Sequence, residues 1–346
     1  MYFASDNAGP ALPEVMAALA DCNRDYAPAY GADALMDEVR AELRRLFEAP
    51  EAAVYLVATG TAANALGLAS LARPFDTIFC TPVAHIHQDE CNAPEFFTGG
   101  AKLTLVPGGD KMTPERLRAA IAAEETRGVH GPQRGPVSLT QVTECGTVYS
   151  LEELAALSAV ARDFGLPVHM DGARFANALV ALDCSPAEMT WKSGIDALSF
   201  GGTKNGCLGV EAVIFFDPAR AREFELRRKR GAHLFSKHRY LSAQMAAYLR
   251  DGLWLDAARR ANAAGARLAE GLRAADAGLA YPVQANMVFA TLPRAIHHRL
   301  IQAGAQYHLW EGALEGSDPD ERLTARLVCD WSARAAETDR FLALLG

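Results

Sequence analysis

A chain of 346 residues is long for one hydrophobic core and short for three, so its length favours two domains, or one large domain with an appendage. Half of the residues are hydrophobic and 22% are charged, a balance that excludes a disordered or fibrous protein. The formal net charge of −8 argues against a nucleic acid as the main partner, because affinity for phosphates requires clustered Lys and Arg.

The seven cysteines are scattered, odd in number and never spaced as a Cys-x-x-Cys pair, so we expect reduced thiols. Residues 1–10 contain no basic-then-apolar leader, and the longest apolar runs are only as long as a strand. The sequence therefore predicts a cytoplasmic protein without a membrane segment.

In chain order, the first strong signal is an amphipathic helix, in which Leu35, Val39 and Leu43 recur at helical spacing. From about residue 50 to about residue 216, short β-rich runs alternate with helical stretches. This is typical of parallel strands joined by crossover helices, an α/β architecture. The expected strands are Val54–Ala58, Thr77–Thr81, Lys102–Val106, Val137–Val142, Pro167–Met170, Ala197–Phe200 and Glu211–Phe216.

Three of the helices between these strands begin with recognisable capping residues. Ser150 and Glu153 have the spacing of a capping box. The pairs Thr113-Pro114 and Asp217-Pro218 each place a capping side chain before a proline at the first helical position. All three predict helix starts.

After Tyr240 the alternation ends, and a long Ala-, Leu- and Arg-rich helical stretch runs to about Ala277. Strand-like Met287–Leu292 and Arg326–Cys329 follow, with helices around them. We interpret this part as a smaller α+β domain. The expected division is residues 1–245 for the N-terminal segment and large domain, and residues 246–346 for the small C-terminal domain.

Two polar residues follow directly on apolar strands of the expected sheet, Asp171 and Lys204. Ligands of open parallel sheets bind beyond the carboxyl ends of the strands, so both side chains should reach one crevice. A lysine that can bond covalently to the cofactor and a carboxylate that pairs with a pyridinium nitrogen are what pyridoxal phosphate requires. Taken singly, a buried Asp can cap a helix and a Lys after glycines is usually a surface residue.

Two further segments fit the same cofactor. Thr59-Gly60-Thr61 lies between a strand and a helix, where unpaired amides and the helix dipole can bind a phosphate, although many strand-to-helix turns look alike. His85 follows the next strand and could stack on the ring or move protons. Because His85-Ile86-His87-Gln88-Asp89 could instead bind a divalent metal, a metallohydrolase is an alternative interpretation.

Taken together, these residues resemble the low-specificity L-threonine aldolases, a family of fold-type I pyridoxal-phosphate enzymes with an aspartate-aminotransferase-like fold. The likeness runs nearly from end to end. The matching segments are Phe3-Ala4-Ser5-Asp6-Asn7, Tyr30-Gly31-Ala32-Asp33, Thr59-Gly60-Thr61-Ala62-Ala63-Asn64, Ala84-His85 with Glu90, Thr140-Gln141-Val142-Thr143-Glu144, His169-Met170-Asp171-Gly172-Ala173-Arg174, Phe200-Gly201-Gly202-Thr203-Lys204-Asn205-Gly206 and Ala325-Arg326-Leu327-Val328.

The resemblance implies that Lys204 carries the cofactor, that Asp171 faces the pyridinium nitrogen and that Arg174 lies beside the phenolic oxygen. His85 would stack on the ring. The remaining cofactor-binding residues expected from the matching segments are Thr59, Gly60, Thr61, Glu90 and Thr143.

For the substrate, the resemblance implies that Ser5 and Arg326 hold the carboxylate, a task that suits a planar guanidinium. His130, in the loop before the strand that begins near Val137, matches a histidine that approaches the substrate hydroxyl. The proton acceptor would be His85, His130 or a bound water.

This chain departs from the family pattern at Ala32, where an acidic residue is common, so the role of that acid is not carried over. Tyr30 and Asp33 remain candidate substrate-binding residues. The phosphate-binding cations that the family supplies near residues 228–239, partly across a subunit boundary, align poorly, and Lys229 and Lys237 are the candidates here.

The implied activity is cleavage of L-threonine, L-allo-threonine and related β-hydroxy-α-amino acids, such as phenylserine, to glycine and an aldehyde. Its partners would be the amino acid, the aldehyde and further copies of the chain, in a homotetramer built from dimers with shared active sites. β-Elimination or transamination would use the same Lys204 and Asp171 and stays open as an alternative. A catalytically silent binding or scaffold protein is a third.

Overall fold

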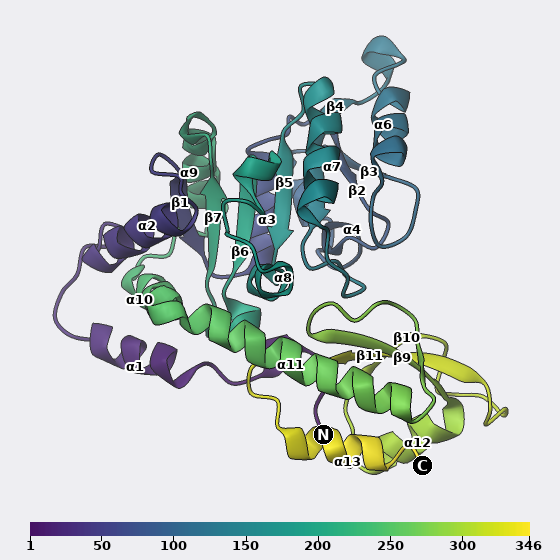
Figure 1. Ribbon diagram of the computed structural model, residues 1–346. Coiled ribbons are helices and arrows are strands. Elements are labelled where there is room, and N and C mark those ends of the chain that lie inside the picture. Colours follow the sequence, from purple (N-terminus) through teal and green to yellow (C-terminus); the bar gives the residue numbers. More distant parts are fainter.

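The computed structural model describes all residues from 1 to 346, and it contains two sheets (Figure 1). The larger sheet has seven strands in the order β1-β7-β6-β5-β4-β2-β3, and β7 alone runs antiparallel to its neighbours. Its strands are β1 (Ala53–Val57), β2 (Asp76–Cys80), β3 (Lys102–Leu105), β4 (Gln133–Thr140), β5 (Val168–Gly172), β6 (Ala197–Gly201) and β7 (Glu211–Phe215). The mainly parallel sheet with crossover helices confirms the expected α/β class.

Ten helices belong to this part of the chain, and the first two of them precede the first strand of the sheet. They are α1 (Pro13–Cys22), α2 (Ala34–Leu46), α3 (Gly60–Ala69), α4 (His85–Gln88), α5 (Ala93–Thr98), α6 (Pro114–Ala123), α7 (Leu151–Asp163), α8 (Phe175–Leu182), α9 (Ala221–Arg230) and α10 (Arg239–Leu249). Short 3-10 turns are η1 (Asp6–Ala8), η2 (Gly128–His130), η3 (Trp191–Ser193), η4 (Thr203–Asn205), η5 (Pro218–Arg220) and η6 (Arg250–Gly252). The three expected caps are present: Ser150 and Glu153 form the full capping box, Thr113 caps α6, and Asp217 caps η5, which leads into α9.

The smaller sheet is antiparallel, in the order β10-β11-β9-β8. Its strands are β8 (Gly278–Leu279), β9 (Met287–Pro293), β10 (His308–Glu311) and β11 (Arg322–Val328), and its helices are α12 (Arg294–Gln302) and α13 (Ala335–Ala343). The sequence predicted β9 and the end of β11 but not β8 or β10, which are short and not fully buried, so no apolar run marks them.

Helix α11 (Leu253–Ala274) connects the two sheets. It packs against α8 beside the large sheet and against β9 and α13 beside the small one (Figure 1). Residue 245, the last of the expected large domain, lies within α10. The chain also starts in the small sheet, because the Phe3 amide donates to the Gln306 carbonyl at 2.8 Å and the Val328 amide donates to the Phe3 carbonyl at 2.8 Å.

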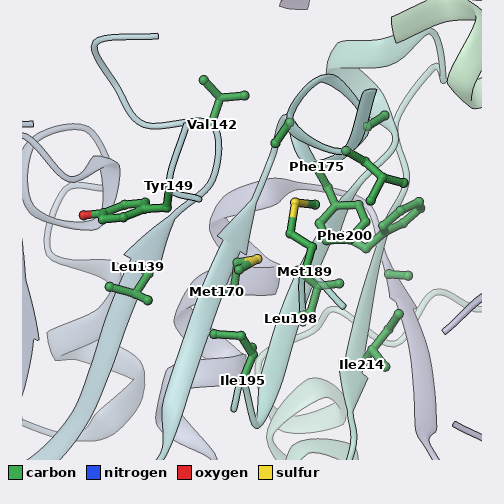
Figure 2. Close-up of a cluster of buried hydrophobic side chains, with 14 of the residues drawn as sticks. Leu139, Val142, Tyr149, Met170, Phe175, Met189, Ile195, Leu198, Phe200 and Ile214 are labelled. Carbon is green, nitrogen blue, oxygen red and sulfur yellow. The ribbon is translucent and has the colours of Figure 1, made fainter. Parts of the chain in front are cut away.

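The core lies on the buried strands in the middle of the large sheet. Every residue of β5, β6 and β7 is buried, as expected for strands covered on both faces. Figure 2 shows part of this core, in which Met170 and Leu198 from neighbouring strands lie in one cluster with Phe175 and Phe200. This packing fixes the ends of β5 and β6, where the polar residues follow. No helix of the structure is both long and apolar enough to cross a bilayer.

Candidate active site

The carboxyl ends of β5 and β6 bring Asp171 and Lys204 to one cavity. The two strands are parallel neighbours with Asp171 opposite Ser199, and Lys204 lies in η4 just after β6. The backbone between them is tight, because a Cβ on Gly201 would lie 2.3 Å from the Ala173 carbonyl oxygen. Only glycine therefore fits at this point.

This cavity has a volume of about 530 Å³ and is lined mostly by polar groups. Its lining includes seven of the expected residues: Thr59, Gly60, Thr61, His85, Glu90, Asp171 and Lys204. Its other chemically active lining residues are Asp89, expected only in the metal alternative, and five to which the sequence reasoning assigned no role: Asn7, Asn64, Glu144, Thr203 and Glu211. The Lys204 amine forms no ion pair, although Glu144 and Asp171 line the same cavity.

The turn that carries Lys204 is held by Glu211, the first residue of β7. Its Oε2 accepts a hydrogen bond of 2.7 Å from the Gly202 amide. Burial raises the pKa of Glu211 to about 7, although hydrogen bonds from Thr203 and Gly202 and the charge of Lys204 oppose this rise. Burying a carboxylate at the start of a fully buried strand costs free energy. An acidic residue at the head of an apolar strand was therefore the feature of the sequence that could have pointed to Glu211.

Helix α3 presents its amino terminus to the cavity. The Thr59 hydroxyl caps the helix and accepts from the Ala62 amide at 3.2 Å, so the amides of Gly60 and Thr61 in the first turn have no partner within the helix. A Cβ on Gly60 would meet no atom within 4 Å, so open space lies in front of it. Free amides at the positive end of a helix dipole beside open space form a site for an anion.

A chain of hydrogen bonds links His85 to Asp171. His85 Nδ1 lies 3.0 Å from Glu90 Oε1, and the Asn64 amide nitrogen donates to Glu90 Oε1 at 2.9 Å and to Asp171 Oδ2 at 2.8 Å. The Ala173 amide donates to the other oxygen of Asp171 at 3.0 Å. The hydrogen bond to Glu90 raises the pKa of His85 above its ordinary value, against the effect of burial.

Arg174 forms a buried ion pair with Asp6, from the N-terminal segment. Its Nε and a terminal nitrogen donate to the two carboxylate oxygens at 2.7 and 2.9 Å, and Asn286 also donates to Asp6 at 3.1 Å. Burial alone would raise the pKa of Asp6, but the charge and hydrogen bonds of Arg174 hold it below its ordinary value. Asp6 thus links Arg174, just before α8, with Asn286, just before β9 of the small sheet.

Arg326 and Ser5 lie where the N-terminal segment meets β11. Arg326 donates to the Ala4 carbonyl at 3.3 Å, while its Nε is buried without a hydrogen-bond partner. Its pKa is lowered, first by burial and then by the charge of Arg174, with which it shares the neighbourhood of Asp6 and Glu144. Ser5 caps η1 and accepts from the Asn7 amide at 3.1 Å. The residues predicted for a substrate carboxylate are therefore close together.

Ser5, Arg174 and Arg326 are not among the residues that line the cavity, and neither are four other expected residues. Asp33 is buried as the cap of α2, where it accepts from the Met36 amide and from Ser242. Thr143 donates to Asp110 at 2.7 Å in a turn. Tyr30 is 50% exposed and has the Lys229 amine 4.9 Å from its ring centroid.

His130, the fourth, is exposed in η2, just before β4 begins. Since β4 and β5 are parallel, His130 lies at the amino edge of the sheet, opposite Lys204 and Asp171. Lys237, like Lys229, is exposed.

The metal alternative depends on His85, His87 and Asp89 acting together. His87 and Asp89 are exposed, whereas His85 turns to the buried Glu90. No three or more His, Cys, Asp or Glu side chains of the structure are grouped so that they could hold a metal ion.

A lysine, a buried carboxylate and a helix amino terminus around one cavity of a sheet with a single reversed strand define the class of fold-type I pyridoxal-phosphate enzymes. A serine palmitoyltransferase from Sphingomonas wittichii has this fold, with a TM-score of 0.72 over 100% of this chain and 86% of its own at 16% identity. Another solved serine palmitoyltransferase, with 17% identity and a TM-score of 0.70, has PLP bound.

Sequence comparison narrows the class. A model of the beta-eliminating lyase family matches residues 2–295. Low-specificity L-threonine aldolases from Pseudomonas sp. and Pseudomonas aeruginosa are 40% and 42% identical, covering 99% and 95% of this chain and 96% and 92% of their own. A threonine aldolase structure from Leishmania major matches with a TM-score of 0.92 at 26% identity, over 99% of this chain and 98% of its own. The chain belongs to the low-specificity L-threonine aldolases within the beta-eliminating lyases, as the sequence motifs predicted, and it is a lyase.

Proposed function

We propose that this protein is a pyridoxal-phosphate-dependent aldolase. It would cleave L-threonine, L-allo-threonine and related β-hydroxy-α-amino acids to glycine and an aldehyde. The observation that carries the proposal is the meeting of Lys204 and Asp171 at one cavity, beside the open amino terminus of α3. The names of the relatives support the same substrate class.

The residues present fit this cofactor. The Lys204 amine has no salt bridge to break before it bonds covalently, and Asp171 is a buried acceptor suited to a protonated ring nitrogen. The free amides of Gly60 and Thr61 suit a phosphate. When bound, pyridoxal phosphate supplies an electron sink for the bond that breaks.

The chain's own side chains would orient the substrate. Arg326 has a buried Nε with an unused hydrogen, and with Ser5 it would hold the substrate carboxylate, which leaves the bond between Cα and Cβ to be aligned. Arg174 would lie beside the phenolic oxygen, where its positive charge disfavours protonation. Glu90 would support the cofactor pocket through its hydrogen bonds with His85 and Asn64, and Thr143 only indirectly, because its hydroxyl bonds to Asp110 and Thr147.

His85 would take the proton of the substrate hydroxyl. If Nδ1–H donates to Glu90, the Nε2 atom is left as an acceptor facing the cavity. Glu90 thereby selects the useful tautomer and orients the ring, which would also stack on the cofactor. His130 is too far away within one chain, so its contribution would have to come from another copy.

We also propose a homo-oligomer, a tetramer of two dimers. Large exposed apolar side chains support self-association, among them Tyr26, Tyr30, Phe235 and Leu208, the last of which lines the cavity. Sizing chromatography would test this, and a fully active monomer would contradict it. The free state of all seven cysteines supports a reducing compartment such as the cytoplasm.

The first experiment is an absorbance spectrum of the purified protein, followed by L-threonine and a joint assay of glycine and acetaldehyde. A visible band from the lysine-bound cofactor, with both products in equal amounts, is the expected result. Ammonia and a keto acid without glycine would instead indicate β-elimination, the reaction named in the family description. No visible band would overturn the cofactor assignment.

A further inference from the structure

Asn64 is a polar side chain in the middle of an apolar helix. Helix α3 has the sequence Gly-Thr-Ala-Ala-Asn-Ala-Leu-Gly-Leu-Ala, and Asn64 is only 2% exposed. A buried amide is costly unless it is hydrogen-bonded, so its partners indicate what it does.

Both amide hydrogens of Asn64 are given to carboxylates. The nitrogen lies 2.8 Å from Asp171 Oδ2 and 2.9 Å from Glu90 Oε1, and the two carboxylates are 3% and 4% exposed. The amide nitrogen, and not the amide oxygen, faces the two carboxylates, because a flipped amide would place its oxygen against two acceptors. In this orientation the Asn64 Oδ1 atom is buried without a partner, as is Glu90 Oε2. The fold therefore leaves two acceptors unsatisfied while keeping both donors on the carboxylates, which indicates a functional arrangement.

Without Asn64, two buried carboxylates would face each other directly. Burial raises the pKa of Glu90, and the charge of Asp171 adds to this, while the hydrogen bonds from His85 and Asn64 oppose it. Other ionisable groups also act on Asp171 from the surrounding elements. They are Lys204 on η4, Arg174 at the start of α8, His85 on α4, His169 on β5 and Glu144 after β4.

We propose that Asn64 is a positioning residue that separates Asp171 from Glu90 with its two N–H groups and so offsets the repulsion between the two carboxylates. Asp171 is then held in place for the cofactor's ring nitrogen, and Glu90 remains an acceptor for His85 Nδ1. This inference rests on the proposed function, which gives Asp171 its partner. It adds a residue for which the family likeness implies no role.

The test is the pH dependence of the dissociation constant for pyridoxal phosphate, measured on Asn64→Leu and Asn64→Asp. Aspartate keeps the shape of asparagine but replaces both donors with acceptors, so it tests the hydrogen bonds even if the leucine variant does not fold. We expect the pH below which binding weakens to rise by about one unit or more in both variants. Asn177→Leu is the matched control, since Asn177 is a buried amide on α8 that donates to Asn262 outside the cavity, and it should bind as the wild type does.

A second substitution distinguishes an effect of charge at Asn64 from an effect of packing. Adding Glu90→Gln to Asn64→Asp removes one of the crowded carboxylates, and the shift should then shrink by at least half. If Asn64→Asp keeps the pH dependence of the wild type, or if Glu90→Gln does not reduce the shift, Asn64 has only a packing role and the inference is wrong. If the wild type itself binds no cofactor, the proposed function fails, and this inference fails with it.

Discussion

The cofactor half of the site and its substrate half are built in different ways. Apart from Asn7, the cofactor half comes from one stretch of chain, from Ala58 to Glu211, at the carboxyl edge of one sheet. The substrate half comes from opposite ends of the chain, with Ser5 and Asp6 at the start and Arg326 on β11. The first half therefore depends mainly on the large sheet, whereas the second depends on how the small sheet and the N-terminal segment pack against it.

The Asp6 carboxylate is where the two halves meet. It accepts from Arg174, just before α8, and from Asn286, just before β9 of the small sheet. A substitution in the substrate half that weakens substrate turnover but not cofactor binding would support this division. A substitution there that weakens both would contradict it. The predictions below run from the largest expected effect to the smallest.

Lys204→Ala should abolish the covalent attachment of the cofactor. We expect aldolase turnover to fall on the order of 10³-fold or more and the visible band to disappear, because the covalent attachment is lost. The control is Lys192→Ala, which removes a partly exposed lysine paired with Glu48. Full turnover together with an unchanged band in the Lys204 variant would refute the assignment.

Asp6→Asn should lower the free energy of unfolding, because it removes the ion pair with Arg174 at the point where the two halves meet. The Arg174 guanidinium would stay buried without its counter-ion, and such losses cost about 3–5 kcal/mol. Urea unfolding should show this decrease, whereas Asp256→Asn, in an exposed pair with Arg259, should cost less than about 1 kcal/mol.

The same pair has a pH signature. Because the pKa of Asp6 is held below the ordinary 3.8, the unfolded chain takes up a proton first, and the stabilisation from Asp6 is lost as the pH falls below about 4. The Asp6→Asn variant should lack this component of acid destabilisation. An acid unfolding curve identical in shape to that of the wild type would argue against it.

Arg326→Lys should affect the substrate half alone. Losing a charged, bidentate contact costs about 1.5–3 kcal/mol, so we expect kcat/KM for L-threonine to fall about 10- to 100-fold, with the visible band intact. Arg322→Lys is the matched control, because Arg322 is exposed on the same strand. Loss of the band in the Arg326 variant would show that the halves are not separable.

His130→Asn should have the smallest effect on a single chain's pocket. His130 is exposed at the opposite edge of the sheet, so the dissociation constant of the cofactor should change by less than about twofold. A fall in turnover with unchanged cofactor affinity would fit a contribution from another copy. A large loss of cofactor affinity would be incompatible with the position of His130.

Much of the cofactor half could be predicted from the sequence. Asp171 lies in the last part of β5, Lys204 and Thr59 lie shortly after β6 and β1, and the carboxyl ends of parallel strands meet at one edge whatever the details of packing. Local order along the chain was therefore enough to bring these residues together. The same reasoning predicted the capping box of α7 and the prolines of α6 and η5, because caps depend on neighbours in sequence.

The partners of these residues were decided by the tertiary structure. Asn64 contacts Glu90 and Asp171, which lie 26 and 107 residues away, and nothing in its neighbourhood along the helix announces either contact beyond an amide in an apolar run. Arg174 was expected beside the cofactor, yet its bidentate partner is Asp6, 168 residues away. Strand order and domain packing determine such contacts.

The sequence by itself determined which residues can carry the chemistry and which edge of the sheet they occupy, because strand ends and helix starts follow from local periodicity and capping. The tertiary structure decided which of them share a cavity. It added Asn64 and Glu211 to the lining, and within one chain it left out seven expected residues, which are Ser5, Tyr30, Asp33, His130, Thr143, Arg174 and Arg326. The physical reason is that burying a charged or polar group requires a specific partner, and that partner comes from whichever distant segment the packed strands bring within hydrogen-bond distance.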